Sequence, residues 1–324
     1  MAKAIVLKEY GSSDVLSLQE VDIRSPGPEE ILIRQTAIGV HFHDIYVRSG
    51  LYKTLSLPGI PGLEATGVVE AIGDVESDFR IGDRIGYVTN TYGAYTTHRV
   101  LKERLAVKLP DSLSDALVAT NFSRMITVEM LTRQVSVLND KHTILITAAA
   151  GGVGRLLCQK ANSLGARVIG TVSTPEKVTV AKSCGCAHAM LYDQSDLINE
   201  VMDMTNGNGV DLVFDSVGAK TIQNSISVLG IRGHLVNFGQ SSGSIAPLLM
   251  SQLAEKSLSV TRPILFHYIK NLDEYHKMGA SAFKSLDDAS LILANPQEIP
   301  LENVALAHKK LESGQGGGSI YLLP

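Results

Sequence analysis

The sequence predicts an α/β protein in which a mostly β domain precedes a doubly wound parallel sheet. The chain has 324 residues, enough for two domains of ~100–200 residues each. Up to about Ser123, short apolar segments alternate with Gly and Pro, which is typical of a β domain. From about Met125, apolar strands alternate with helical stretches of roughly ten residues or more, which predicts a parallel sheet with helices on both faces.

Composition narrows the class of protein further. The formal net charge of −4 gives no basic field for nucleic acid. No run approaches the ~20 apolar residues of a membrane span, and the N-terminus lacks the apolar core of a signal peptide. The three cysteines, Cys158, Cys184 and Cys186, are too few for a disulfide framework and suit a reducing compartment. We therefore expect a cytoplasmic protein with neither a nucleic-acid partner nor a membrane partner.

The strands of each domain can be read from local patterns. In the first domain they include "AKAIVLKEY", "EEILIRQTAIGV", "ATGVVEAIG", "GDRIGYVT" and "GAYTTHRV". In the second they read as continuous Val, Ile and Leu runs, as in parallel strands that are covered on both faces. These strands are Thr143–Thr147, Arg167–Val172, Ala187–Tyr192, Val210–Asp215, Gly233–Phe238 and Leu258–Thr261. The final apolar segment, "IYLLP", is a candidate to return to the first domain.

A glycine cluster follows the first strand of the second domain. The segment Ala149-Ala150-Gly151-Gly152-Val153-Gly154 reads A-x-G-x-x-G and leads into a helix-like run, Val153–Leu164. In a βαβ unit such glycines let the backbone approach a pyrophosphate and let the helix pack on the strand. The helix N-terminus then offers free N–H groups to the anion. A turn made only for packing is the alternative, but the strand–turn–helix–strand context favours a dinucleotide site.

The end of the second strand indicates which dinucleotide is bound. A site for NADH places Asp or Glu there, to bind the ribose 2′-hydroxyl, whereas this chain has Ser173 and Thr174. Pro175 suits a first helical position, and Lys177 follows in the first turn. A lysine there opposes the helix dipole, and a bound 2′-phosphate would offset that cost. With Tyr192 at the end of the third strand, the pattern favours NADPH; a solvated surface lysine is the alternative for Lys177.

Several motifs together resemble one family. The segments "GVHFHDIYVRSGLY", "PGIPGLEATGVV", "GDRIGYV", "AAAGGVG", "GTVSTPEK", "FDSVG" and "VTRP" are similar, in order and over nearly the whole chain, to the zinc-free quinone oxidoreductases of the medium-chain dehydrogenase/reductase superfamily, relatives of zeta-crystallin. The resemblance implies a GroES-like domain at residues 1–123, to which residues 266–324 return, and a Rossmann domain at residues 124–265. It also implies NADPH in an interdomain cleft, delivery of a hydride or of single electrons to quinones, and a homodimer.

The resemblance also implies the residues of the site. Tyr46 and Tyr52 would line the quinone cleft, and His41 and His43 would lie beside them. Pro263, Ile264 and Leu265 would lie near the nicotinamide. The other implied cofactor contacts are Phe42, Asp44, Tyr46, Met130, Gly151, Gly152, Val153, Gly154, Ser173, Thr174, Lys177, Tyr192, Ser216, Phe238, Gly239, Gln240 and Ser241.

Four positions depart from the family pattern. The family usually has Asn where this chain has His41, often Tyr at Met130 and Asn at Gln240, and commonly a basic residue at Gly314. These changes bear on cofactor affinity and on the shape of the substrate pocket. A protonated His41 would favour a developing quinone oxyanion, so that turnover would rise as the pH falls from about 8 to about 6; the alternative is that His41 only packs and hydrogen-bonds.

The same loop raises the question of a metal. His41 and His43 lie two residues apart, so on a strand both would face one side. In the zinc-dependent relatives a His-Glu pair follows, but here Leu63 precedes Glu64. A catalytic zinc needs three protein ligands in fixed geometry. We therefore expect no metal.

The leading functional hypothesis is an NADPH-dependent quinone reductase, whose proton donors would be His43, Tyr46 or Tyr52. One rival is reduction of the C=C bond of 2-alkenals or enones. Another is a crystallin-like protein that binds NADPH without useful turnover. The sequence does not identify the physiological acceptor.

Overall fold

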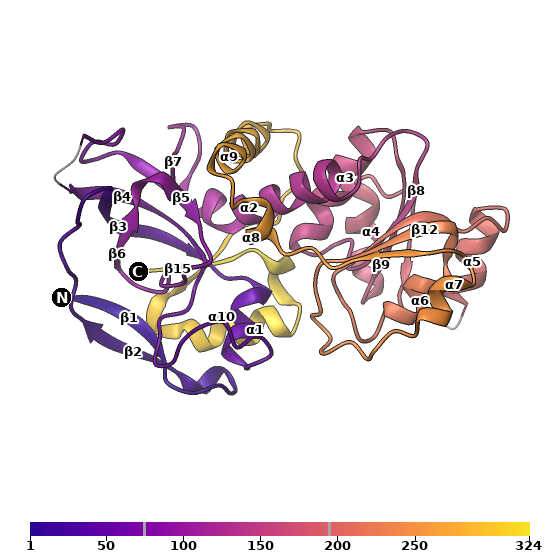
Figure 1. Cartoon of the computed structure of the whole chain (residues 1–324), viewed down its shortest axis with the longest axis horizontal. Coiled ribbons are helices and arrows are strands. Elements are labelled where there is room, and N and C mark those ends of the chain that lie inside the picture. Colours follow the sequence, from indigo (N-terminus) through magenta and orange to yellow (C-terminus); the bar gives the residue numbers. More distant parts are fainter. Residues whose placement is uncertain (74–75, 194–195) are drawn as a thin grey trace. The chain divides into compact units, whose positions relative to one another are not determined.

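The chain forms two compact units in the computed structural model, which describes residues 1–73, 76–193 and 196–324. The first unit comprises Met1–Ile126, Tyr268–Ser290 and Ala294–Pro324, and the second comprises Thr127–His267 and Leu291–Leu293. In Figure 1 the yellow C-terminal segment lies among the indigo N-terminal strands. The first unit is therefore built from both ends of the chain.

The first unit contains two β-sheets. Strands β1 (Ala2–Leu7) and β2 (Leu16–Val21) form an antiparallel pair. The larger sheet has the order β14-β15-β3-β4-β5-β7, with β6 paired to β3. Strand β15 pairs antiparallel with β3, which joins the C-terminus to the N-terminal sheet. The strands of the larger sheet are β3 (Glu30–Gly39), β4 (Glu64–Ile72), β5 (Arg84–Val88), β6 (His98–Lys102), β7 (Ala106–Lys108), β14 (Gln297–Pro300) and β15 (Ile320–Leu323).

Helix α10 (Val304–Glu312) of the first unit buries one face. Its buried residues fall at Val304, Ala307, His308 and Leu311, a helical period. This face joins the β3 and β4 residues in one apolar core. The remaining helices are α1 (Phe42–Arg48), α2 (Asp115–Glu129) and α9 (Leu272–Leu286), with short 3-10 turns at Ser13–Val15, Glu103–Leu105, Leu301–Asn303 and Gln315–Gly318.

The second unit is built on a six-stranded parallel sheet in the order β10-β9-β8-β11-β12-β13. This confirms the predicted α/β class. Its strands are β8 (Thr143–Ile146), β9 (Arg167–Val172), β10 (His188–Leu191), β11 (Val210–Asp215), β12 (Leu229–Asn237) and β13 (Ser259–Thr261). Strand β12 begins four residues before the predicted Gly233. The reason is a register shift against β11 that leaves Arg232 at a φ of 63°.

Helices cover this sheet and complete the second unit. The predicted helix after the glycine cluster is α3 (Gly152–Ser163), and the other helices are α4 (Pro175–Ser183), α5 (Leu197–Met204), α6 (Ile222–Ser227), α7 (Met250–Ala254) and α8 (Leu265–Tyr268). A π-helical segment, Met130–Val135, directly follows α2. The three cysteines are buried and free, as expected of small core residues. In the described part of the chain, no helix combines the length and apolar character needed to cross a membrane.

Candidate functional site

The turn between β8 and α3 has the form of an anion site. Gly151 precedes the helix with a φ of −79° and makes no side-chain cap, and the first turn carries no acidic residue. A Cβ on Gly154 would lie 2.1 Å from the Ala148 carbonyl oxygen, so only glycine lets the helix start this close to the strand end. The N–H groups of this turn, at the positive end of a helix dipole, fit a pyrophosphate.

Two features of this turn could not be read from the glycine pattern. Ala148 has a φ of 49°, a left-handed conformation that is costly for a residue with a side chain. Arg155 Nε donates to the Ala150 carbonyl at 2.8 Å and ties the turn to the first turn of α3. The turn is therefore held in one conformation without a ligand, which lowers the ordering cost of binding.

Ser173 and Lys177 meet at one corner of the sheet, and Tyr192 follows the end of the neighbouring strand. Val172 and Leu191 are paired across β9 and β10, so Ser173 and Tyr192 follow neighbouring strand ends. The Tyr192 N–H donates to the Val172 carbonyl at 3.1 Å. Lys177 Nζ donates to Ser173 Oγ at 3.0 Å, from an exposed position in the first turn of α4. An ammonium group and a hydroxyl group thus share one end of the sheet, a donor pair that suits a phosphate.

One acid, Glu176, belongs to the first turn of α4. A hydrogen bond from the Thr174 side chain is the main reason that the pKa of Glu176 is lowered. Strand β9 itself ends at Val172 and passes directly to Ser173, with no carboxylate at its end. The position that would select a free ribose 2′-hydroxyl is therefore occupied by a hydroxyl residue.

A buried carboxylate, Asp215, organises the next loop of the second unit. Its Oδ1 accepts from the Val217 and Gly218 N–H groups at 2.8 and 2.9 Å, and its Oδ2 accepts from Ser225 Oγ at 2.8 Å. The Ser216 N–H donates to Thr147 Oγ1 at 3.0 Å. These contacts fix the predicted cofactor residue Ser216 at the carboxyl end of β11, where ligands bind in open α/β sheets.

The Phe238–Ser241 turn follows the neighbouring strand and lies against Ser216. The Phe238 N–H donates to the Asp215 carbonyl at 2.8 Å, and the Ser241 N–H donates to the Ser216 carbonyl at 3.2 Å. A Cβ on Gly239 would lie 2.6 Å from that same carbonyl oxygen. The structure thus brings Ser216 together with the turn that contains Gly239, Gln240 and Ser241.

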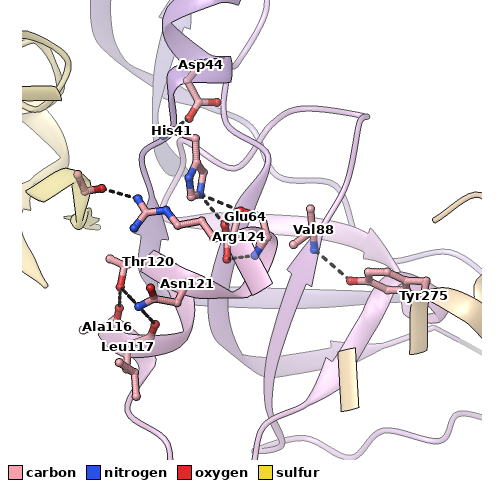
Figure 2. Close-up of polar contacts among 12 residues, drawn as sticks. His41, Asp44, Glu64, Val88, Ala116, Leu117, Thr120, Asn121, Arg124 and Tyr275 are labelled. Carbon is pink, nitrogen blue, oxygen red and sulfur yellow. Dashed lines mark hydrogen bonds and ion pairs between the residues drawn. The ribbon is translucent and has the colours of Figure 1, made fainter. Parts of the chain in front are cut away.

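In the first unit, His41 lies against a buried carboxylate. His41 Nε2 is 2.5 Å from Glu64 Oε2, and Glu64 is fully buried. Figure 2 shows the His41 ring pointing toward Glu64, with Asp44 on the other side of His41. The His41 N–H donates to Asp44 Oδ2 at 2.8 Å. His41 and His43 do not lie on a strand: α1 begins at Phe42, and Asp44 in its first turn accepts the backbone N–H of His41, the residue before the helix.

Glu64 has a further partner that sequence reasoning missed. The Ser123 N–H donates to Glu64 Oε1 at 3.0 Å, and Ser123 Oγ donates to Glu64 Oε2 at 2.5 Å. Both carboxylate oxygens are therefore engaged by protein groups. Within residues 1–73, 76–193 and 196–324, no group of three His, Cys, Asp or Glu side chains is arranged to hold a metal ion.

Aromatic side chains gather beside this pair. The His43 and Tyr52 ring centroids are 5.4 Å apart, and those of Tyr46 and Tyr52 are 5.0 Å apart, both in edge-to-face geometry. Tyr92 was not predicted, yet its hydroxyl lies 3.1 Å from His43 Nε2. Burial, together with the charge of His41, lowers the pKa of His43 to about 4. His43 is therefore neutral at pH 7.

A second buried polar cluster lies behind α1. Tyr95 Oη is 3.0 Å from His308 Nε2, and Arg48 Nη1 is 3.5 Å from His308 Nδ1. Arg48 also forms an ion pair with Glu312 at 2.6 Å. Burial, and then the Arg48 charge, lowers the pKa of His308 to about 3. His308 and Glu312 lie four residues apart on α10, so their side chains are neighbours on one helix face. This spacing is the sequence signal that could have indicated that both contact Arg48.

The remaining predicted residues take various positions. Asp44, in the first turn of α1, is fully buried, and burial raises its pKa to about 6. Met130 is buried in the π-helical segment. Pro263 is buried, whereas Ile264 is exposed. Gly314 lies just after α10 with a φ of 70°.

The fold is that of a known class of dehydrogenase. One family model, the alcohol dehydrogenase GroES-like domain, matches residues 27–111, and a second, zinc-binding dehydrogenase, matches residues 152–281. Together with the parallel sheet and its glycine turn, these matches define a medium-chain dehydrogenase/reductase.

Full-length relatives specify the family. The chain is 38% identical to the quinone oxidoreductase of Pseudomonas aeruginosa and 37% identical to quinone oxidoreductase 1 of Escherichia coli (strain K12), with 100% of both chains covered in each case. It is 36% identical to the 2-haloacrylate reductase of Burkholderia sp, covering 100% of this chain and 99% of that one. The structure of the Escherichia coli quinone oxidoreductase complexed with NADPH has a TM-score of 0.95 at 34% identity, with full coverage of both chains. The chain belongs to the quinone oxidoreductase family.

Proposed function

We propose that this chain is an NADPH-dependent quinone reductase. The observation that carries the proposal is the corner formed by Ser173, Lys177 and Tyr192, beside a glycine turn that fits a pyrophosphate. It is supported by full-length relatives named quinone oxidoreductase and by the NADPH complex of the Escherichia coli relative. The resemblance seen in the sequence is thereby confirmed.

The residues of the second unit bind and select the cofactor. The N–H groups of the Gly151–Gly154 turn hold the pyrophosphate, and Lys177 with its hydroxyl neighbours holds the 2′-phosphate. Ser216 and the Phe238–Ser241 turn contact the rest of the dinucleotide. When bound, NADPH supplies a hydride from its nicotinamide ring.

The residues of the first unit position the acceptor. A quinone is flat and apolar, and the edge-to-face rings of Tyr46 and Tyr52 offer it an aromatic surface. His41, held by Glu64, and His43 supply polar groups near that surface. Reduction of a quinone requires neither a covalent nucleophile nor a metal. With both Glu64 oxygens engaged by Ser123 and His41, we propose that the enzyme is zinc-independent.

We also propose that the chain is a cytoplasmic homodimer. Strand β13 lies at the end of the six-stranded sheet, and Val260 on it is 38% exposed. Leu249 and Met250 are also exposed apolar residues of this unit, at 64% and 77%. An uncovered sheet edge with exposed apolar side chains favours pairing with a second copy. Sedimentation of the pure protein tests this, and a monomer at micromolar concentration would contradict it.

One alternative activity has specific support. A full-length relative at 36% identity is a 2-haloacrylate reductase, which parallels the reduction of 2-alkenals considered from the sequence. A third possibility is a protein that binds NADPH without turnover. NADPH consumption with quinones, 2-alkenals and 2-haloacrylates as separate acceptors distinguishes the three. We expect the quinones to give the highest kcat/KM. A preference for either alkene class would replace the proposal, and binding without consumption would overturn it.

A further inference from the structure

A chain of hydroxyl groups connects His43 to the surface of the first unit. Thr54 Oγ1 is hydrogen-bonded to Tyr92 Oη, and Tyr92 Oη is 3.1 Å from His43 Nε2. Thr54 is exposed, Tyr92 is 7% exposed and His43 is partly buried. The three residues come from α1, from the segment that follows it and from the loop between β5 and β6. Together they form a continuous polar path through a mostly aromatic environment.

The inner end of this path lies at the proposed acceptor surface. The His43 ring packs against Tyr52 at 5.4 Å and against Tyr92 at 6.1 Å, and Tyr52 packs against Tyr46. Thus Nε2 of the imidazole is hydrogen-bonded to the Tyr92 hydroxyl. The ring also packs against Tyr52, one of the residues that would hold a quinone. An imidazole has two nitrogens of opposite hydrogen-bonding character, which suits it to this position.

The backbone at Tyr92 supports a specific role for its side chain. Tyr92 has a φ of 51°, a left-handed conformation that is strained for an aromatic residue. The side chain of Arg99, 9% exposed, donates to the Tyr92 carbonyl and to Thr91 Oγ1, the latter at 2.9 Å. A buried guanidinium group therefore holds this loop in a conformation that the residue alone does not favour. Strain of this kind is concentrated at functional positions.

We propose that Thr54, Tyr92 and His43 form a relay that carries a proton from solvent to the reduced quinone. The inference rests on the proposed function. It adds Thr54 and Tyr92 to the site, although the sequence indicated neither as a site residue. It also specifies that the quinone takes up two electrons and is protonated inside the site. Because His43 is neutral at pH 7, it acts by accepting a proton at Nε2 while releasing one from Nδ1, without a stable imidazolium.

The relay balances the reaction. Hydride transfer to a quinone leaves a hydroquinone monoanion. Its oxygen takes the proton on His43 Nδ1, while Tyr92 Oη–H gives its proton to His43 Nε2. Thr54 Oγ1–H reprotonates Tyr92, and Thr54 takes a proton from water. The sum is one quinone, one NADPH and one proton giving one hydroquinone and one NADP⁺.

The test compares quinones whose hydroquinones differ in acidity. Tyr92→Phe keeps the ring and removes the hydroxyl. We expect kcat to fall on the order of a hundredfold for a methyl-substituted quinone, the lower end of what proton transfer by a side chain contributes. The loss should shrink to about twofold or less for a tetrahalogenated quinone, because its hydroquinone anion needs no proton at neutral pH. NADPH affinity should not change.

Three further variants complete the test, and the first controls for loop position. Tyr10, which follows β1, donates from its Oη to the Leu55 carbonyl at 3.3 Å, next to Thr54. Tyr10→Phe therefore removes a hydroxyl that contacts the same loop without interrupting the path. It should leave kcat unchanged for every quinone. Thr54→Val should lower kcat for the methyl-substituted quinone, and Thr54→Ser should restore it. In the free protein, ¹⁵N NMR of the His43 ring should show the Nδ1–H tautomer, and Tyr92→Phe should shift it toward Nε2–H.

The outcomes separate the relay from the proposed function. If the wild-type protein reduces none of the quinones, both the relay and the proposed function are overturned. If wild type is active and Tyr92→Phe is unimpaired, or loses the same factor with every quinone, the relay alone is overturned. An equal loss in Tyr10→Phe would likewise overturn it, since the effect would then come from loop position.

Discussion

The two units build their sites in opposite ways. In the second unit, the phosphate turn is made by backbone groups of consecutive residues, and its one strict requirement is the absence of a side chain at Gly154. In the first unit, His41 meets Ser123, 82 residues further along the chain, on a carboxylate from β4. One site is local and depends on backbone conformation. The other is assembled by the tertiary fold and depends on buried polar contacts, so the two should respond to different perturbations.

The largest expected effect is at the backbone site. Gly154→Ala places a Cβ 2.1 Å from the Ala148 carbonyl oxygen, which cannot move without displacing α3 from the sheet. We expect a loss of more than about 3 kcal/mol in unfolding free energy and no measurable NADPH binding. Gly151→Ala is the matched control, because its Cβ would lie 3.0 Å from the same oxygen and its φ of −79° is ordinary. Equal losses in urea unfolding of the two variants would contradict this account of the turn.

The buried polar groups of the first unit should make stability depend on pH. His308 has a pKa lowered to about 3 and His43 one lowered to about 4. A lowered histidine pKa means that the unfolded chain binds protons first, so stability is lost as pH falls from about 6.5 toward about 3. Asp44 acts oppositely: with a pKa raised to about 6, it costs stability as pH rises from about 4 to about 6.

A variant at His308 isolates that contribution. In His308→Gln, the fall in unfolding free energy between pH 6.5 and pH 4 should be smaller than in wild type by about 2 kcal/mol or more. His276→Gln, at a partly exposed histidine bonded to the Arg104 carbonyl, should follow the wild-type curve. Urea titrations at several pH values measure both. A His308→Gln curve parallel to wild type would show that this histidine is not the group that titrates.

A smaller and more selective effect is expected at Lys177. Lys177→Ala should weaken NADPH binding roughly tenfold to a hundredfold, because charge-assisted contacts to a phosphate contribute ~1.5–3 kcal/mol. NADH binding should barely change. Lys182→Ala, in the last turn of the same helix, is the control. Fluorescence titration of both cofactors decides the matter, and equal losses for NADPH and NADH would remove Lys177 from the 2′-phosphate site.

No effect is expected from metal removal. Both Glu64 oxygens are taken by Ser123 and His41, which leaves no open ligand set at this pair. Prolonged dialysis against EDTA should therefore leave quinone turnover unchanged. Loss of turnover together with near-stoichiometric zinc by elemental analysis would show that the His41–Glu64 pair is a metal site.

The comparison also explains how far sequence alone reaches. The glycine turn, the strand ends at Ser173 and Tyr192 and the position of Lys177 follow from local patterns, because period, spacing and helix-start chemistry are encoded within about 50 residues of chain. The helix start at Phe42 was not read from the sequence, although Asp44, three residues after His41, is a local capping signal.

The polar contacts between distant segments of the first unit had no local signal. Tyr92 lies 49 residues from His43 and 38 from Thr54, and Tyr95 lies 213 residues from His308. Such pairs form only once β strands from distant segments are in register. Buried polar residues must then find partners, but the sequence does not say which ones.

The central claim is that the chain transfers reducing equivalents from NADPH to quinones, and one measurement tests it most directly. The decrease in absorbance of the reduced cofactor, followed with and without a simple quinone and with NADPH and NADH in parallel, gives kcat/KM for each cofactor. We predict quinone-dependent oxidation with kcat/KM at least about tenfold higher for NADPH, the lower end of a phosphate contact. Oxidation that does not depend on quinone, or equal use of NADH, would contradict the account.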